Sequence, residues 1–163
     1  MEPETNRETH KEEIEMDIIE IKKLLTSGNI QYEVIQQEKP ILSASDAEGY
    51  YPVEKSAPTF VLQTENGLIG CMVSSQNGRL DFDKLKQIFG FSKLKMADRK
   101  KIKSQTGYDV GAIPLVGLHL PCIFDRKLLQ HDFVYGGTGN ELLTLKIAPS
   151  ELLKANEIIG MFD

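Results

Sequence analysis

The sequence predicts an α+β fold with a mixed, barrel-like β-sheet surrounded by helices. Short runs of alternating apolar and polar residues, typical of half-buried strands, interleave with short helical patterns. No strand–helix–strand repeat typical of a doubly wound parallel sheet is visible. The chain has 163 residues, of which 40% are hydrophobic, which suits one domain with its own core.

The N-terminal part is expected to differ from the rest of the chain. Residues 1–10 are polar and acidic without apolar periodicity, so we expect them to be disordered. The remainder, residues 11–163, is expected to form a single domain. Its first helix is predicted over 11–27, where isoleucine and leucine recur at helical spacing. An alternating strand over 31–36 and a short capped helix over 43–49 follow.

Turn and capping residues delimit the central elements. Asn66-Gly67 lies between two apolar runs, which predicts a β-hairpin with strands over 59–64 and 68–74. Asp81 and Gly90 bracket a predicted helix over 82–89. The side chains expected to face the core from this helix are Phe82, Leu85, Ile88 and Phe89. A strand over 92–96 and a short basic helix over 98–105 complete this part.

The C-terminal part is predicted to alternate short strands with short helices. Strands are expected over 120–124, 133–135 and 142–147. A short helix is expected over 126–130, and a last helix begins at Pro149, because proline suits the first turn.

Charge is unevenly distributed along the chain. The net charge of −5 argues against broad, sequence-independent nucleic-acid binding. Residues 79–103 nevertheless carry nine bases against three acids. This basic segment is either a local phosphate contact or a solvated helix face.

Cysteine, histidine and hydropathy patterns limit the possible classes. Cys71 and Cys122 form no CxxC motif and no export signal is visible, so we expect reduced thiols and a cytoplasmic protein. The three histidines are scattered, so neither a metal site nor a cofactor is expected. No apolar run approaches the ~18 residues of a membrane span, so no membrane association is expected.

Two glycine-bearing loops, at 111–117 and 136–139, flank a short apolar run that ends at Asp125. Glycine lets the backbone approach a ligand closely, so these loops are candidates for a pocket lined by main chain. The second loop either holds a phosphate or carboxylate on backbone N–H groups or simply connects two strands. Asp125 either orients a ligand hydroxyl or water as a catalytic residue, or caps the helix over 126–130. The two roles are compatible.

Five ordered segments carry a resemblance. Residues 106–117 read TGYDVGAIPLVG, similar to a TGY-x-VGG-x-x-P-x-G loop, and residues 120–125 read LPCIFD, similar to LP-x-x-x-D. Residues 135–139 read YGGTG, residues 145–152 read LKIAPSEL, similar to L-x-I-x-P-x-DL, and residues 78–85 contain RLD-x-x-KL. In these segments the chain resembles the YbaK/prolyl-tRNA synthetase editing-domain family of aminoacyl-tRNA deacylases.

The resemblance implies hydrolysis of the ester between a mischarged small amino acid and the 3′-terminal ribose of tRNA. It implies tRNA as a partner, with an aminoacyl-tRNA synthetase as a further candidate, and a pocket whose backbone donors build an oxyanion site. Asp125 is the implied catalytic residue. The implied specificity residues are Ile113, Leu115 and Val116. The implied substrate-binding residues are Gly111, Ala112, Ile113, Pro114, Leu115, Gly117, Gly136, Gly137, Thr138 and Gly139.

Three departures from the family pattern leave activity open. Pro58 occupies the strand position where the family has a lysine that contacts the terminal adenosine or its phosphate, and Lys55 does not align with it. Gln37 stands where some members have a tyrosine, and residues 111–114 read GxxP instead of GxxxP. The hypotheses are therefore an active deacylase with altered preference, or an inactive relative. The latter would bind aminoacyl-tRNA 3′ ends, another small ligand or a protein partner.

Overall fold

The computed structural model describes residues 19, 22–23, 25–26, 31–41 and 44–163. The predicted disorder of residues 1–10 and most of the predicted helix over 11–27 lie outside the described residues. Within them, eight strands and several short helices alternate along the chain, so the predicted α+β class is confirmed. None of the helices within these ranges is long and apolar enough to cross a membrane.

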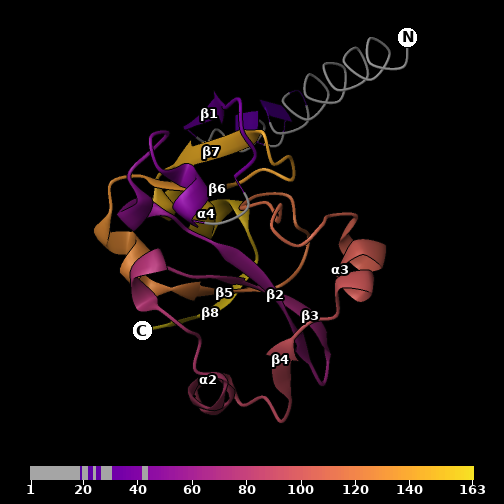
Figure 1. Ribbon diagram of the computed structural model, residues 1–163. Helices are drawn as coiled ribbons and strands as arrows, with labels where there is room; N and C mark the ends of the chain where they lie inside the picture. The colour runs from indigo at the N-terminus through magenta and orange to yellow at the C-terminus, as the bar shows by residue number, and fades with distance from the viewer. Residues whose placement is uncertain (1–18, 20–21, 24, 27–30, 42–43) are drawn as a thin grey trace, which may run out of the picture.

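The larger sheet has five strands in the order β4-β2-β3-β5-β8 (Figure 1). Strands β2 (Thr59–Thr64) and β3 (Gly67–Met72) form the antiparallel hairpin that Asn66-Gly67 predicts. The remaining strands of this sheet are β4 (Leu94–Met96), β5 (Cys122–Asp125) and β8 (Ile158–Phe162). Strand β5 runs parallel to both β3 and β8, so the sheet is mixed.

The smaller sheet has three antiparallel strands in the order β1-β7-β6. They are β1 (Tyr32–Gln36), β7 (Leu143–Ile147) and β6 (Val134–Gly137). The segment just before β2 joins the two sheets, because Ser56 bridges Tyr135 of β6 and the Ala57 N–H donates to the Tyr135 carbonyl at 2.8 Å. The mixed sheet is as predicted, but the strands form two linked sheets and not a closed barrel.

The helices begin at capping or first-turn residues, of which Asp81 and Pro149 were predicted. Helix α2 (Phe82–Phe89) begins at Asp81, whose carboxylate accepts a hydrogen bond from the Lys84 N–H. Helix α3 (Arg99–Thr106) begins at Asp98, and α4 (Pro149–Ala155) has its proline in the first turn. Short 3₁₀ turns lie at η1 (Ala44–Ala47), η2 (Val53–Lys55), η3 (Ser75–Asn77) and η4 (Arg126–Gln130).

One predicted core contact of α2 is wrong. Ile88 is 46% exposed, whereas Leu85 is buried and Phe89 packs against the core cluster. The helix has only eight residues and meets the sheet along one narrow stripe, so Ile88 falls outside the contact.

The C-terminal strand β8 was not predicted. It pairs in parallel with β5, which lies more than thirty residues earlier. Parallel pairing depends on a distant partner and leaves no turn signal in the local sequence.

Both cysteines lie in the interior and are free, and their thiols are expected to be unreactive in the folded protein. Burial raises the pKa of Cys122 to about 11 and raises that of Cys71 as well. Reaction with Ellman's reagent at pH 8 should be at least about 100-fold slower in the native protein than in guanidinium chloride. Because the folded thiols hold their protons more tightly, stability should fall as pH rises above the unfolded thiol pKa of about 8.5. Rapid native labelling of either thiol would contradict this prediction.

Candidate functional site

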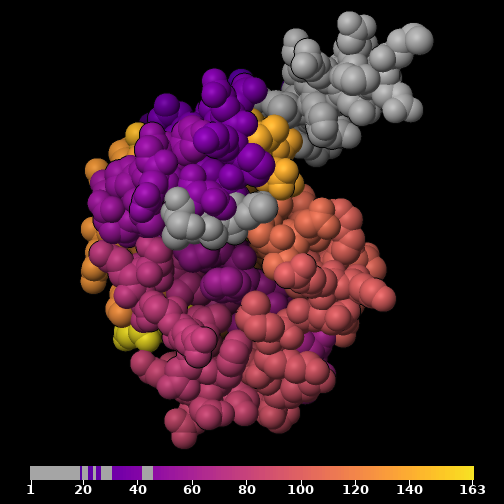
Figure 2. Space-filling model, in the orientation of Figure 1, coloured from indigo at the N-terminus to yellow at the C-terminus, as the bar shows by residue number. Residues whose placement is uncertain are grey.

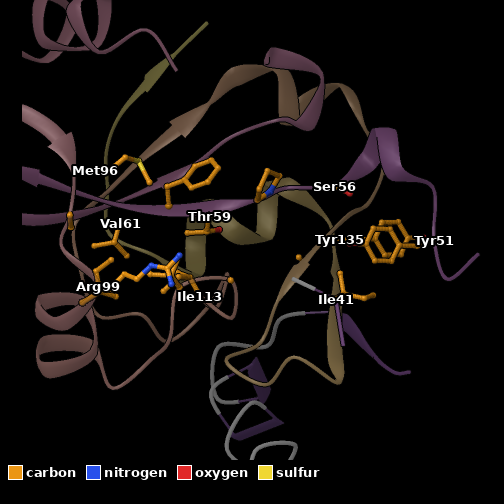
Figure 3. A pocket seen from close by; sticks show the side chains of 16 residues that line it. Ile41, Tyr51, Ser56, Thr59, Val61, Met96, Arg99, Ile113 and Tyr135 are labelled. Atoms are coloured by element: carbon orange, nitrogen blue, oxygen red, sulfur yellow. The ribbon is translucent and has the colours of Figure 1, made fainter. Parts of the chain in front are cut away.

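A cavity of about 390 Å³ lies between β2, the β4–α3 connection, the Gly111 loop and β6 (Figure 3). In the space-filling view, the surface around β2 lies between the indigo and purple atoms of the described residues that precede it and the orange-red segment that holds α3 (Figure 2). The lining residues are Ile41, Tyr51, Ser56, Pro58, Thr59, Phe60, Val61, Met96, Ala97, Arg99, Ile102, Val110, Gly111, Ile113, Tyr135 and Gly136.

Most of the cavity wall is apolar. Val61 and Ile102 are buried and belong with Ile113 to one core cluster, so this wall continues directly into the interior. Met96 and Val110 are 46% and 41% exposed and lie at the rim. The cavity therefore offers an apolar floor with a mouth open to solvent.

Two hydroxyl groups on the β2 side of the cavity are buried without a hydrogen bond of normal geometry. They are Ser56 Oγ and Thr59 Oγ1, which flank Pro58 at the start of β2. Buried polar atoms are nearly always paired, with protein or with an ordered partner. These two hydroxyls are therefore the polar groups of the cavity best placed to bond a ligand.

A stacked aromatic pair forms another part of the lining. The rings of Tyr51 and Tyr135 are parallel within 2°, with centroids 4.6 Å apart. Burial raises the pKa of the Tyr51 phenol, and the nearby Ser56 hydroxyl offsets part of that rise. The phenol thus stays protonated at neutral pH and can donate a hydrogen bond.

The first glycine loop reaches the cavity directly. Gly111 has φ of 95°, a left-handed conformation that suits glycine, and it lines the cavity together with Ile113. Of the predicted substrate-binding residues, Gly111, Ile113 and Gly136 line the cavity. The others, which are Ala112, Pro114, Leu115, Gly117, Gly137, Thr138 and Gly139, are not among its lining residues.

The second glycine loop supports the first more than it faces the cavity. A Cβ at Gly136 would lie 2.5 Å from Leu115 Cδ1, and one at Gly137 would lie 2.1 Å from the Ile113 carbonyl oxygen. The Leu115 N–H donates to the Gly137 carbonyl at 2.9 Å. Leu115, predicted to set specificity, is fully buried beneath Gly136. The Thr138 hydroxyl bonds to the carbonyls of Asn140 and Leu143 within its own turn.

Asp125 lies at the end of β5, outside the cavity lining. Its carboxylate is fully buried and accepts hydrogen bonds from the N–H of Ser74 at 2.9 Å and of Lys127 at 3.0 Å, and from Asn77 Nδ2 at 2.9 Å. The bond from Lys127 caps η4, so the predicted capping role is confirmed. The catalytic role stays a prediction.

The departures from the family pattern have clear places in the structure. Pro58 lines the cavity. Lys55 forms an ion pair with Asp132, in which Lys55 Nζ lies 3.1 Å from Asp132 Oδ1. Gln37 is buried: its Nε2 donates to the Glu141 carbonyl at 2.7 Å, and its Oε1 accepts from the Thr144 hydroxyl at 3.2 Å. Lys55 and Gln37 thus have partners elsewhere, and neither is among the described residues that line the cavity.

Most of the lining residues were not singled out from the sequence, among them Arg99 and Tyr51. Arg99 belongs to the basic segment over 79–103. Its position at the cavity follows from where α3 begins in the folded protein, which the sequence alone does not show. Tyr51 lies between the predicted helix over 43–49 and the predicted strand over 59–64, in a segment without any motif. Among the residues that the structure describes, no group of three His, Cys, Asp or Glu side chains is placed to hold a metal ion.

The profile of the aminoacyl-tRNA editing domain matches residues 38–155. The chain belongs to this family. All of the residues that line the cavity fall within the matched segment. No curated protein matches the chain.

Solved structures share the fold. A crystal structure of a hypothetical protein has a TM-score of 0.78 at 23% identity, covering 86% of this chain and 96% of its own. A protein proposed to be a trans-editing enzyme for prolyl tRNA synthetase has a TM-score of 0.77 at 23% identity. The match covers 88% of the present chain and 94% of that protein. A protein from Marinobacter aquaeolei, provisionally described as acting in signal transduction, has a TM-score of 0.56 at 14% identity. The match covers 86% of the present chain and 29% of that protein.

Proposed function

We propose that residues 11–163 form an aminoacyl-tRNA deacylase domain that removes a mischarged small amino acid from tRNA. The observation that carries this proposal is the apolar cavity, which lies wholly within the segment matched to the editing family. The similarity to a proposed trans-editing enzyme adds support at the level of the fold. In this proposal tRNA is the main partner, an aminoacyl-tRNA synthetase is a further one, and the protein acts in the cytoplasm.

The reaction is hydrolysis of an ester. A water oxygen attacks the ester carbonyl carbon, the bond from that carbon to the ribose oxygen breaks, and a proton passes to the ribose oxygen. The products are a free amino acid and intact tRNA. No cysteine, histidine or lysine is among the described residues that line the cavity, so the attacking group in this proposal is water.

The cavity residues have distinct roles in this proposal. Val61, Ile102 and Ile113 receive the apolar side chain of a small amino acid, and their packed wall limits its size. The hydroxyls of Ser56 and Thr59 bond to the ribose or the ester. Backbone groups near Gly111 stabilise the negative charge that develops on the carbonyl oxygen.

A panel of mischarged tRNAs tests the proposal. Mischarged tRNAs carrying alanine, serine or cysteine are incubated with the protein. Release of the amino acid is followed and compared with a heat-inactivated control. We expect release of at least one amino acid well above that control. Release no faster than the control for every tRNA would overturn the deacylase proposal.

Blocking the cavity with Val110→Trp should abolish this release, lowering kcat/KM by at least about 100-fold. Val110 lines the rim and is exposed, so an indole can fill the mouth with little cost to folding. The matched control is Ile88→Trp, an equally exposed position on α2 that does not line the cavity. Equal activity of Val110→Trp and the parent would remove the cavity from the mechanism.

A second candidate function is binding without catalysis. The observation that favours it is Pro58 at the strand position of the family lysine, with Lys55 paired to Asp132 instead of entering the cavity. The occurrence of the fold within a much longer chain of another description is compatible with such a role. Binding of an aminoacylated 3′ end without any release would establish this alternative.

A further inference from the structure

We infer that Arg99 forms the anion-binding part of this cavity and holds a nucleotide phosphate at its mouth. The inference rests on the proposed function and names the residue that recognises the nucleic-acid part of the substrate. Arg99 is the sole charged side chain among the described residues that line the cavity. Figure 3 shows it beside Ile113, on the same side as Val61 and Met96.

Among the residues that the structure describes, the Arg99 guanidinium has no ion-pair partner. Within the described part of the chain the Arg99 side chain makes no salt bridge, whereas two other basic residues of α3 are engaged: Lys101 bonds to Gln63, and Lys103 pairs with Asp109 at 3.3 Å. The carboxylate of Asp98, directly before Arg99, accepts from backbone N–H groups at the start of α3. A cation that borders a cavity without a counter-charge favours an anionic ligand there.

Hydroxyl donors supply a second, independent sign of a ligand. Ser56 is only 5% exposed, lines the same cavity, and leaves its Oγ without a hydrogen bond of normal geometry. Thr59 Oγ1 on β2 is likewise buried without a hydrogen bond of normal geometry. A sugar or phosphate oxygen of a nucleotide held by Arg99 would satisfy such groups, and an apolar ligand would leave them unpaired.

The chemistry of the proposed substrate decides which anion Arg99 meets. An amino acid in ester linkage has lost its carboxylate, and its free amino group is cationic, so Arg99 repels rather than binds it. The phosphodiester beside the terminal ribose is the anion that remains. A guanidinium stays charged at all accessible pH values and matches phosphate with two parallel N–H donors, so it binds and does not act as a base.

The position of Arg99 fits a group that stays near solvent. The side chain is exposed at the first residue of α3, while the wall formed by Val61 and Ile102 is buried. This arrangement seats the amino acid inward and the phosphate at the mouth. Arg99 is thus a positioning residue that orients the ester over the cavity.

Binding of three probes tests the inference by calorimetry: adenosine, adenosine 5′-monophosphate and the trinucleotide CCA. The parent should bind both phosphate-bearing probes at least about tenfold more tightly than adenosine. Arg99→Gln should weaken binding of those two probes about tenfold and leave adenosine within about twofold. Arg99→Lys should recover part of the loss. The matched control is Lys100→Gln, an exposed neighbour on α3 that does not line the cavity and should change each affinity by less than about twofold.

Each outcome has a defined meaning. Unchanged binding of the phosphate-bearing probes to Arg99→Gln would overturn the inference, as would an equal loss for Lys100→Gln, which would reveal only a general charge effect. Arg99-dependent binding of CCA supports the inference for a polynucleotide end. Arg99-dependent binding of the mononucleotide alone supports the phosphate site but counts against tRNA as the source. Failure of the deacylase proposal appears separately, as absence of amino-acid release in the tRNA panel.

The separate effects of Arg99→Gln on KM and kcat distinguish phosphate binding from a purely structural role. If the protein hydrolyses a mischarged tRNA, Arg99→Gln should raise KM about tenfold and change kcat by less than about threefold. The salt dependence of KM should also become less steep, by about one phosphate contact. A fall in kcat at unchanged KM would contradict the assignment of Arg99 to phosphate binding.

Discussion

Replacing Asp125 with alanine should lower the free energy of unfolding by about 3–5 kcal/mol, because three donors lose a buried acceptor at once. The carboxylate has no exposed surface and accepts from Ser74, Asn77 and Lys127. These partners connect the end of β5 to η3 and η4, so the loss affects the junction of three segments. Urea unfolding followed by circular dichroism measures the change.

The matched control is Asp109→Ala. The Asp109 side chain is 77% exposed and pairs with Lys103 on the surface, so its loss should cost less than about 1 kcal/mol. An Asp125→Ala variant as stable as the Asp109→Ala variant would show that the buried hydrogen bonds contribute little.

Asp125→Asn separates the structural role from the predicted catalytic role. The amide keeps the size of the side chain but replaces one acceptor oxygen with a donor, so we expect an intermediate loss of stability, about 2 kcal/mol. Amino-acid release is then measured at a temperature where this variant is folded. Full activity of the folded variant would assign Asp125 to the scaffold, and a loss of kcat would support the catalytic prediction.

Local signals explain which parts of the fold could be predicted. The hairpin of β2 and β3 follows from Asn66-Gly67, and the ends of α2 follow from Asp81 and Gly90. In each case the structural determinant lies within a few residues of the element it defines. Strand β8 and the division into two sheets depend on pairings between distant segments, and no short-range pattern reports them.

The site was predictable to the extent that one sequence motif contains it. Gly111 and Ile113 belong to the glycine loop that resembles the family pattern, and both line the cavity. Leu115 is in the same motif and was predicted to set specificity. It is instead buried in the core, because Gly136 packs directly against its side chain. Arg99 comes from the basic segment over 79–103, for which the sequence left open either a local phosphate contact or a solvated helix face. Only the tertiary arrangement shows that Arg99 borders a cavity.

Substituting Gly137 with alanine should cost about 3–4 kcal/mol of stability, since the added methyl group would meet backbone rather than a movable side chain. Its Cβ would lie 2.1 Å from the Ile113 carbonyl oxygen and 3.1 Å from the Ile113 carbonyl carbon. The two loops are also joined by the bond from the Leu115 N–H to the Gly137 carbonyl. Relief of the clash requires the first glycine loop to move away from β6. The loss is measured as a shift of the urea midpoint at constant m-value.

Gly160→Ala is the control that isolates the role of backbone contact. Its Cβ would also come too close to a neighbour, at 2.5 Å, but that neighbour is Cε1 of the Phe89 ring, which can shift. We expect a cost of about 1 kcal/mol there. Because Ile113 lines the cavity, Gly137→Ala should also lower amino-acid release under conditions where it is folded, whereas Gly160→Ala should not. If both variants lose stability equally while release is unaffected, the second glycine loop does not position the first, and the cavity wall is held by the core packing of Ile113 alone.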